Sequence, residues 1–167
     1  MINKIFAALL ALVVVTQVHA EPVLPKLSTN DLNGQEVELP SDLPGNPTIV
    51  FIAFKQNQQP SINAWVNRLG LQDAGGPAWV ELPVVGQGAA LIRTYIDNGM
   101  RSGITSKKMR ARTITIYSNR RAFNRAMEIP TMSQIYVALV EQDGTVRSMI
   151  AGDVTEEKVD KLRAAIY

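Results

Sequence analysis

The chain has 167 residues, of which 46% are hydrophobic and 19% charged, a formal net charge of +2, one histidine and no cysteine. This length suits a single domain with a substantial core. The absence of cysteine excludes thiol–disulfide exchange and stabilisation by disulfides.

The N-terminal residues have the features of a secretory signal peptide. Lys4 precedes an apolar run over residues 5–15, and Val18-His19-Ala20 ends in a small residue, as signal peptidase requires. The run is short for a membrane span, and an uncleaved anchor is the alternative. We expect residues 1–20 to be removed and the domain of residues 21–167 to be periplasmic.

Cleavage would change the chemistry that the chain can perform. Loss of Lys4 takes the 17 basic residues to 16, against 15 acidic ones, and loss of His19 leaves no histidine. Zinc sites depend mainly on Cys and His, and Ser-His-Asp catalysis requires a histidine base. We therefore expect no metal and no cofactor.

The first half of the domain predicts a hairpin, a buried strand and a helix. Asn33-Gly34 is a hairpin turn signal, and polar and apolar residues alternate over residues 36–39. The apolar run over residues 48–54 is typical of a strand buried on both faces. Pro60 suits the first turn of a helix, which Gly70 would end.

The second half alternates strands and helices and ends in another hairpin. We expect strands over residues 78–85, 112–117, 135–140 and 146–150, helices over 89–98, after Asn119 and from Thr155, and a loop over 100–111. The order predicts an α/β domain with a central mixed sheet flanked by helices.

Two stretches resemble the peroxiredoxin-like and TlpA-like branch of the thioredoxin-like superfamily. LSTNDLNGQEVELPSDLPGNPTIVFIAF, residues 27–54, resembles the opening of these proteins, with its hairpin, Gly-Pro break and apolar strand. Residues 119–166 resemble their C-terminal half, in which a Pro-Thr pair, a strand, an Asp-Gly turn, a strand, a glycine and a last helix follow in order. The resemblance implies a thioredoxin-like fold with an N-terminal β-hairpin. Short motifs such as WVELPVVG resemble, more faintly, the mitochondrial ATP synthase assembly factors of this superfamily.

The resemblance places the redox pair of the family on two glutamines. The family carries a C-x-x-C pair where the first long strand meets a helix, and that pair falls on Gln56 and Gln59. A glutamine amide donates and accepts hydrogen bonds but passes no electrons and is a poor nucleophile. The geometry is therefore expected to persist without the redox function.

The Pro-Thr pair of the family matches Pro130-Thr131, although the polar stretch that follows is longer here. The family proline is usually cis and faces the redox pair. The resemblance thus implies a cis bond between Ile129 and Pro130, with backbone groups of Ile129 free to pair with an extended peptide. We predict an exported non-redox binding, chaperone-like or assembly protein whose partner, a protein or peptide, contacts one edge. That edge would comprise Gln56, Asn57, Gln58, Gln59, Ile129, Pro130 and Thr131.

Residues 98–127 form a basic segment without a single Asp or Glu. It holds half of the basic residues that follow residue 20, namely Arg101, Lys107, Lys108, Arg110, Arg112, Arg120, Arg121 and Arg125. Such a field attracts an acidic protein or an anionic membrane surface, whereas nucleic acid is not expected for an exported chain. The alternative is a solvated surface whose charges pair with acidic residues elsewhere. We expect Arg110, Arg112, Arg120 and Arg121 to help orient the partner.

An enzyme with cysteine-independent chemistry, a hydrolase or a peroxidase-like relative, is the alternative function. It would need a constellation around Ser61, Tyr117 or Glu128, because no paired carboxylates or other base stand out in the sequence. A closed pocket with two carboxylates or a Lys–Ser pair would favour the enzyme. A shallow edge lined by amides would favour binding.

Overall fold

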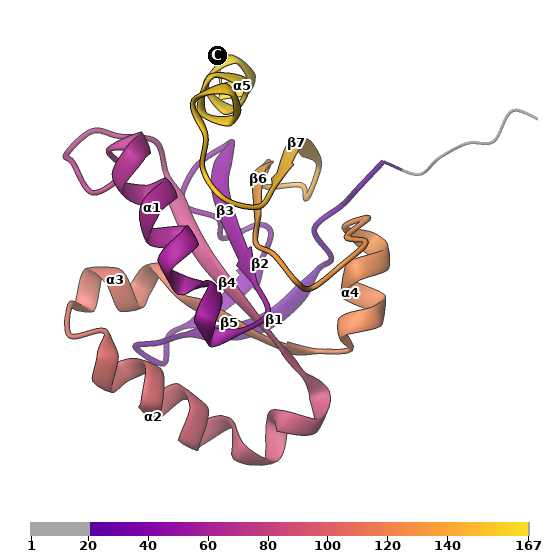
Figure 1. The fold of residues 1–167 in the computed structure, drawn as a ribbon. Coiled ribbons are helices and arrows are strands. Elements are labelled where there is room, and N and C mark those ends of the chain that lie inside the picture. The colour runs from indigo at the N-terminus through magenta and orange to yellow at the C-terminus, as the bar shows by residue number, and fades with distance from the viewer. Residues whose placement is uncertain (1–20, 167) are drawn as a thin grey trace, which may run out of the picture.

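A computed structural model describes residues 21–166 of the chain, so the predicted signal peptide lies outside the described residues. One mixed sheet runs through the molecule (Figure 1), with the strand order β2-β1-β5-β4-β3-β6-β7. The strands are β1 (Leu27–Asp31), β2 (Glu36–Leu39), β3 (Thr48–Ala53), β4 (Trp79–Gly86), β5 (Ile114–Ser118), β6 (Tyr136–Val140) and β7 (Val146–Ala151). The helices are α1 (Gln59–Leu69), α2 (Arg93–Gly103), α3 (Lys107–Arg112), α4 (Arg120–Ala126) and α5 (Glu156–Ile166), with the 3-10 turns η1 (Gln56–Gln58) and η2 (Gln87–Ile92).

The sheet is mixed, as predicted. Strand β4 pairs in parallel with β3 and with β5, whereas β1 and β6 are antiparallel to their neighbours. The predicted N-terminal hairpin is confirmed as β1–β2. Its turn is closed by the Asp31 carboxylate, whose Oδ1 accepts hydrogen bonds from the backbone N–H groups of Asn33 and Gln35.

Helices cover both faces of the sheet (Figure 1). Every residue of β3 is buried, in keeping with its sequence, which is apolar at every position after Thr48. On one face, Ile49 and Phe51 belong to the same core cluster as Trp65 of α1 and Leu162 of α5. On the other face, Val50 and Ile52 of β3 pack in a second cluster with Phe123 of α4.

The segment from residue 87 to residue 112 differs from the prediction. The expected helix over 89–98 is the turn η2 followed by α2, which continues to Gly103, and the expected loop over 100–111 contains α3. Helix α3 begins because the Ser106 hydroxyl accepts a hydrogen bond from the Met109 N–H. Gly99 lowers helix propensity but does not end α2. The helix thus runs past Gly99, and the Ser106 cap starts a second helix within the predicted loop.

The predicted cis bond between Ile129 and Pro130 is wrong. Among residues 21–166, the cis peptide bonds are Leu39–Pro40 and Asn46–Pro47. The chain reverses after α4 by another route, because Glu128 adopts a left-handed φ of 52° and the Ile129 N–H donates to the Asn124 carbonyl at 2.8 Å. The turn is thus made before the proline is reached.

Candidate functional site

Gln58 joins the start of α1 to the loop that precedes β6. Its side-chain Oε1 accepts hydrogen bonds from the N–H groups of Phe54 at 2.8 Å and Lys55 at 3.2 Å. Its Nε2 donates to the Met132 carbonyl at 3.0 Å. Because Gln58 is only 7% exposed, this amide is an internal clamp. Gln58 thus ties its stretch to Met132, the residue that directly follows the predicted stretch Ile129–Thr131. The joint contact of the two stretches with a partner stays a prediction.

Gln59 stabilises a buried acid. Its Nε2 donates to Glu81 Oε2 at 3.1 Å and to Asn63 Oδ1 at 3.2 Å. Glu81 lies on β4 and is 4% exposed. Burial raises the pKa of the Glu81 carboxyl, and the hydrogen bond from Gln59 partly opposes that rise. Gln59 is itself exposed, as Gln56 and Asn57 are, but its amide is engaged with Glu81 and Asn63.

The stretch from Ile129 to Thr131 uses much of its hydrogen-bonding capacity within the protein. Ile129 is buried, and its N–H is taken by Asn124, so the predicted pairing of that N–H with an extended peptide is wrong. Pro130 is exposed and has no N–H to offer. The Thr131 carbonyl accepts from the Tyr136 hydroxyl at 2.8 Å.

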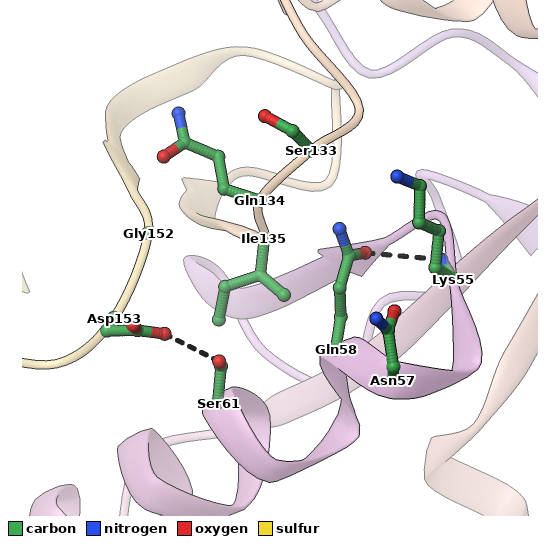
Figure 2. A pocket seen from close by; sticks show the side chains of 9 residues that line it. All are labelled: Lys55, Asn57, Gln58, Ser61, Ser133, Gln134, Ile135, Gly152 and Asp153. Carbon is green, nitrogen blue, oxygen red and sulfur yellow. Dashed lines mark hydrogen bonds between the residues drawn. The ribbon is translucent and has the colours of Figure 1, made fainter.

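A polar hollow of about 280 Å³ lies beside Gln58 (Figure 2). It opens between the start of α1, the loop before β6 and the turn after β7. The lining residues are Lys55, Asn57, Gln58, Ser61, Ser133, Gln134, Ile135, Gly152 and Asp153. Three amides, two hydroxyls, one ammonium and one carboxylate thus surround a space with a single apolar side chain, that of Ile135. We call this site the polar hollow.

The lower wall of the polar hollow is tied together across the sequence. Ser61 of α1 donates its hydroxyl to Asp153 Oδ1 at 2.5 Å, as Figure 2 shows. Behind them, the Trp65 Nε1–H donates to the Gly152 carbonyl at 3.0 Å. Gly152 has a φ of 83°, which favours glycine. The wall is therefore held in place before any ligand arrives.

The residues proposed for the enzyme alternative are not assembled into a catalytic group. Lys55 and Ser61 both line the polar hollow, but the Ser61 hydroxyl is bound to Asp153, and the hollow has one carboxylate. The Tyr117 hydroxyl donates to Asp97 Oδ1 at 2.7 Å outside the hollow, and burial, followed by this bond, raises the pKa of Tyr117. Glu128 is exposed at the end of α4.

The basic residues of the segment 98–127 do not line the polar hollow. Arg110 Nε donates to the Ile104 carbonyl at 2.6 Å, which ties α3 to the end of α2. The Arg112 guanidinium lies 4.8 Å from the centre of the Trp79 ring, and burial lowers its pKa. Arg120 Nε donates to the Val84 carbonyl at 3.2 Å, whereas Arg121 is exposed. Their contact with a partner stays a prediction.

The basic segment has no internal counter-charge in the part of the chain that the structure describes. The ion pairs between residues 21 and 166 are Arg68–Glu156, Arg93–Asp97 and Arg147–Glu141. None of them includes a basic residue of the segment 98–127. The alternative interpretation, in which acidic residues elsewhere neutralise this segment, therefore finds no support among these residues.

Comparisons with known proteins identify the fold. No protein-family model matches the sequence, and no curated protein resembles it closely enough to count as a match. Among solved structures, the exposed lipoprotein thioredoxin of Streptococcus pneumoniae matches with a TM-score of 0.55 at 12% identity, over 85% of this chain and 98% of that one. The chain has a thioredoxin-like fold. The thio-disulfide isomerase of Thermus thermophilus matches with a TM-score of 0.50 at 17% identity, over 89% and 97% of the two chains. BsSco, a member of the Sco family of cytochrome c oxidase assembly proteins, matches with a TM-score of 0.55 at 11% identity, over 87% and 94%.

At such low sequence identity, these structural matches establish the thioredoxin-like fold alone. The sequence adds that this chain contains no cysteine. In residues 21–166 no helix combines the length and the apolar character that a bilayer crossing demands.

Sequence reasoning missed several residues of the polar hollow, among them Lys55, Ser133, Gln134 and Asp153. The one signal that could have found the last of these is the glycine before the final helix, which the thioredoxin-like resemblance includes and which Asp153 directly follows.

Proposed function

We propose that this thioredoxin-like chain is an exported, non-redox binding protein, acting as a chaperone or assembly factor, that holds a short segment of a partner polypeptide in the polar hollow. The observation that carries the proposal is the lining itself, in which three amides and two hydroxyls surround a preformed space whose wall is braced by the Ser61–Asp153 hydrogen bond. Without cysteine the site holds a partner but exchanges no electrons with it.

The proposal assigns different roles to neighbouring amides. Gln58 is consumed by three internal hydrogen bonds and fixes the shape of the site. By contrast, the side chains of Asn57 and Gln134 line the hollow and make no hydrogen bond to another residue between 21 and 166. Because the internal hydrogen bonds of Gln58 already fix the floor of the hollow, only the rim side chains lose conformational entropy when a ligand binds.

The chemistry of the rim favours polypeptide as the ligand. Backbone peptide groups alternate donors and acceptors, and an Asn or Gln amide offers both. Lys55 adds one cation that suits a carbonyl or carboxylate oxygen. A space of about 280 Å³ is smaller than most drug-sized pockets, so it fits one or two residues of a chain.

The test uses the chain from residue 21 onward and an unfolded probe. A globular protein that has been reduced and carbamidomethylated stays unfolded and gains no charge from the modification. We expect it to bind in a fluorescence anisotropy titration, and its native form not to bind. Loss of two rim amides in Asn57→Ala/Gln134→Ala removes hydrogen bonds that contribute about 0.5 to 1.5 kcal/mol each, so the affinity should fall by about 5- to 150-fold.

Gln72→Ala is the matched control, because Gln72 is an exposed amide in the loop after α1 that does not line the hollow. This variant should bind the probe as the parent does. Equal affinity of Asn57→Ala/Gln134→Ala and the parent chain would refute the proposed site.

A further inference from the structure

Three large apolar side chains are exposed together where η2 runs into α2. Leu91 is 96% exposed, Tyr95 81% and Ile92 54%. Leu91 and Ile92 are the last two residues of η2, and Tyr95 lies in the first turn of α2. We call this group the apolar tip. In Figure 1, α2 lies at the periphery of the molecule. Exposed apolar groups of this size are a signature of an interaction surface.

The apolar tip faces outward because polar contacts hold the other side of α2. No residue of α2 is fully buried. Arg93 Nη2 donates to Asn30 Oδ1 at 3.0 Å, and Arg101 Nε donates to the Leu32 carbonyl at 2.6 Å. Asp97 accepts from Tyr117 at 2.7 Å. These bonds fix the helix by its polar side, so the apolar residues are left without a place in the core.

Basic residues flank the apolar tip on both sides along the chain. Beyond the end of α2, Lys107 and Lys108 are exposed on α3, which Arg110 ties to α2 through the Arg101 carbonyl at 3.0 Å. On the other side, the Arg120 side chain lies beside Gly86, directly before η2. Because the basic segment has no acidic partner among residues 21–166, its charge is available to an external anion.

We infer that the apolar tip, together with the exposed Lys107 and Lys108 at the start of α3, docks on an anionic phospholipid surface. Apolar side chains that protrude from a helix can be buried by inserting into the boundary between headgroups and acyl chains of a bilayer. Tyrosine suits that region because one end of it is apolar and the other polar. A protein partner would instead need a matching cavity for each side chain. This inference concerns a different surface from the polar hollow and does not depend on it.

The test uses vesicles and an introduced reporter. The chain from residue 21 contains every described element, and its two tryptophans, Trp65 and Trp79, are at most 1% exposed. In a Tyr95→Trp variant, the introduced indole is thus the only one that lipid can reach. We expect vesicles of phosphatidylcholine and brominated phosphatidylglycerol to quench part of its fluorescence. Vesicles of brominated phosphatidylcholine alone should quench little.

Flotation with phosphatidylglycerol vesicles then separates the two contributions. Leu91→Ser/Tyr95→Ser should reduce binding at least tenfold. Lys107→Gln/Lys108→Gln should reduce it about 30-fold, since each lysine near an anionic surface contributes about 1 kcal/mol, and binding by the parent chain should weaken as salt is added. The matched control Val23→Ser/Lys161→Gln changes an exposed apolar residue and an exposed lysine elsewhere, and should bind like the parent.

Three results would overturn the inference. One is equal binding to neutral and anionic vesicles, and another is unchanged binding by both face variants. The third is self-association in analytical ultracentrifugation that requires Leu91 and Tyr95 while vesicles are not bound, which would assign the face to a second copy of the chain. Parent-like circular dichroism of the variants would exclude unfolding as the cause of any loss.

Discussion

Replacing Gln58 by alanine should destabilise the protein far more than replacing its neighbour Gln56. Gln58→Ala removes the acceptor of two backbone N–H groups and the donor to the Met132 carbonyl. Phe54 is buried, so its N–H loses its partner without access to water, at a cost of about 1 to 3 kcal/mol. Lys55 and Met132 are exposed, so water can replace their lost bonds at about 0.5 to 1 kcal/mol each.

The expected loss of unfolding free energy is therefore about 2 to 5 kcal/mol, a large part of the stability of a domain of this size. Urea unfolding followed by the fluorescence of the buried Trp65 and Trp79 measures it. Gln56→Ala is the control, because Gln56 is exposed and its side chain makes no hydrogen bond to any residue between 21 and 166. It should change stability by less than about 0.5 kcal/mol. A Gln58→Ala variant as stable as the control would refute the clamp.

Three further outcomes follow from the structure. Glu81→Gln should raise the free energy of unfolding, because the pKa of Glu81 is raised by burial: the acid stabilises the fold fully only below its unfolded pKa, and that contribution is lost as the pH rises through the folded pKa. The gain over the parent, measured by urea unfolding from pH 4 to pH 8, should grow with pH to at least about 1 kcal/mol; a gain that shrinks toward pH 8 would contradict the assignment. Asn119→Ala should cost about 1 kcal/mol, since the Asn119 side chain caps α4 through the N–H groups of Arg121 and Ala122, and an unchanged urea midpoint would contradict that role. Gly144→Ala should lower the melting temperature by several degrees, because the added Cβ would lie 2.8 Å from the Leu24 carbonyl at a φ of 98°; a melting temperature equal to that of the parent would show that this turn relaxes freely.

Local signals predicted most of the fold. The structure places a turn or a helix end at each residue that predicted one locally, namely Asn33-Gly34, Pro60, Gly70 and Asn119. Each of these residues favours its structure through its own backbone conformation or through a capping hydrogen bond. The segment 100–111 was predicted wrongly because α3 depends on a capping serine and on the contact of Arg110 with α2, which hydrophobic periodicity does not report.

The site was less predictable than the fold. Strand order and family resemblance brought Gln58 close to the loop after Pro130, but the direction of each side chain depends on contacts distant in sequence. Gln58 turns inward to Met132, 74 residues away, and Ser61 meets Asp153, 92 residues away. The chain reversal before Pro130 uses a left-handed Glu128, a conformation that residue type alone does not predict for glutamate.

The most direct test of a cysteine-free thioredoxin-like chain that holds polypeptide is a ¹⁵N nuclear magnetic resonance titration with the unfolded, carbamidomethylated probe. We predict that the shifts will be concentrated on residues that line the polar hollow, above all the side-chain amides of Asn57 and Gln134 and the backbone of Ser133. Saturating probe that leaves these signals unmoved, or that moves only signals from residues 91–108, would contradict the account.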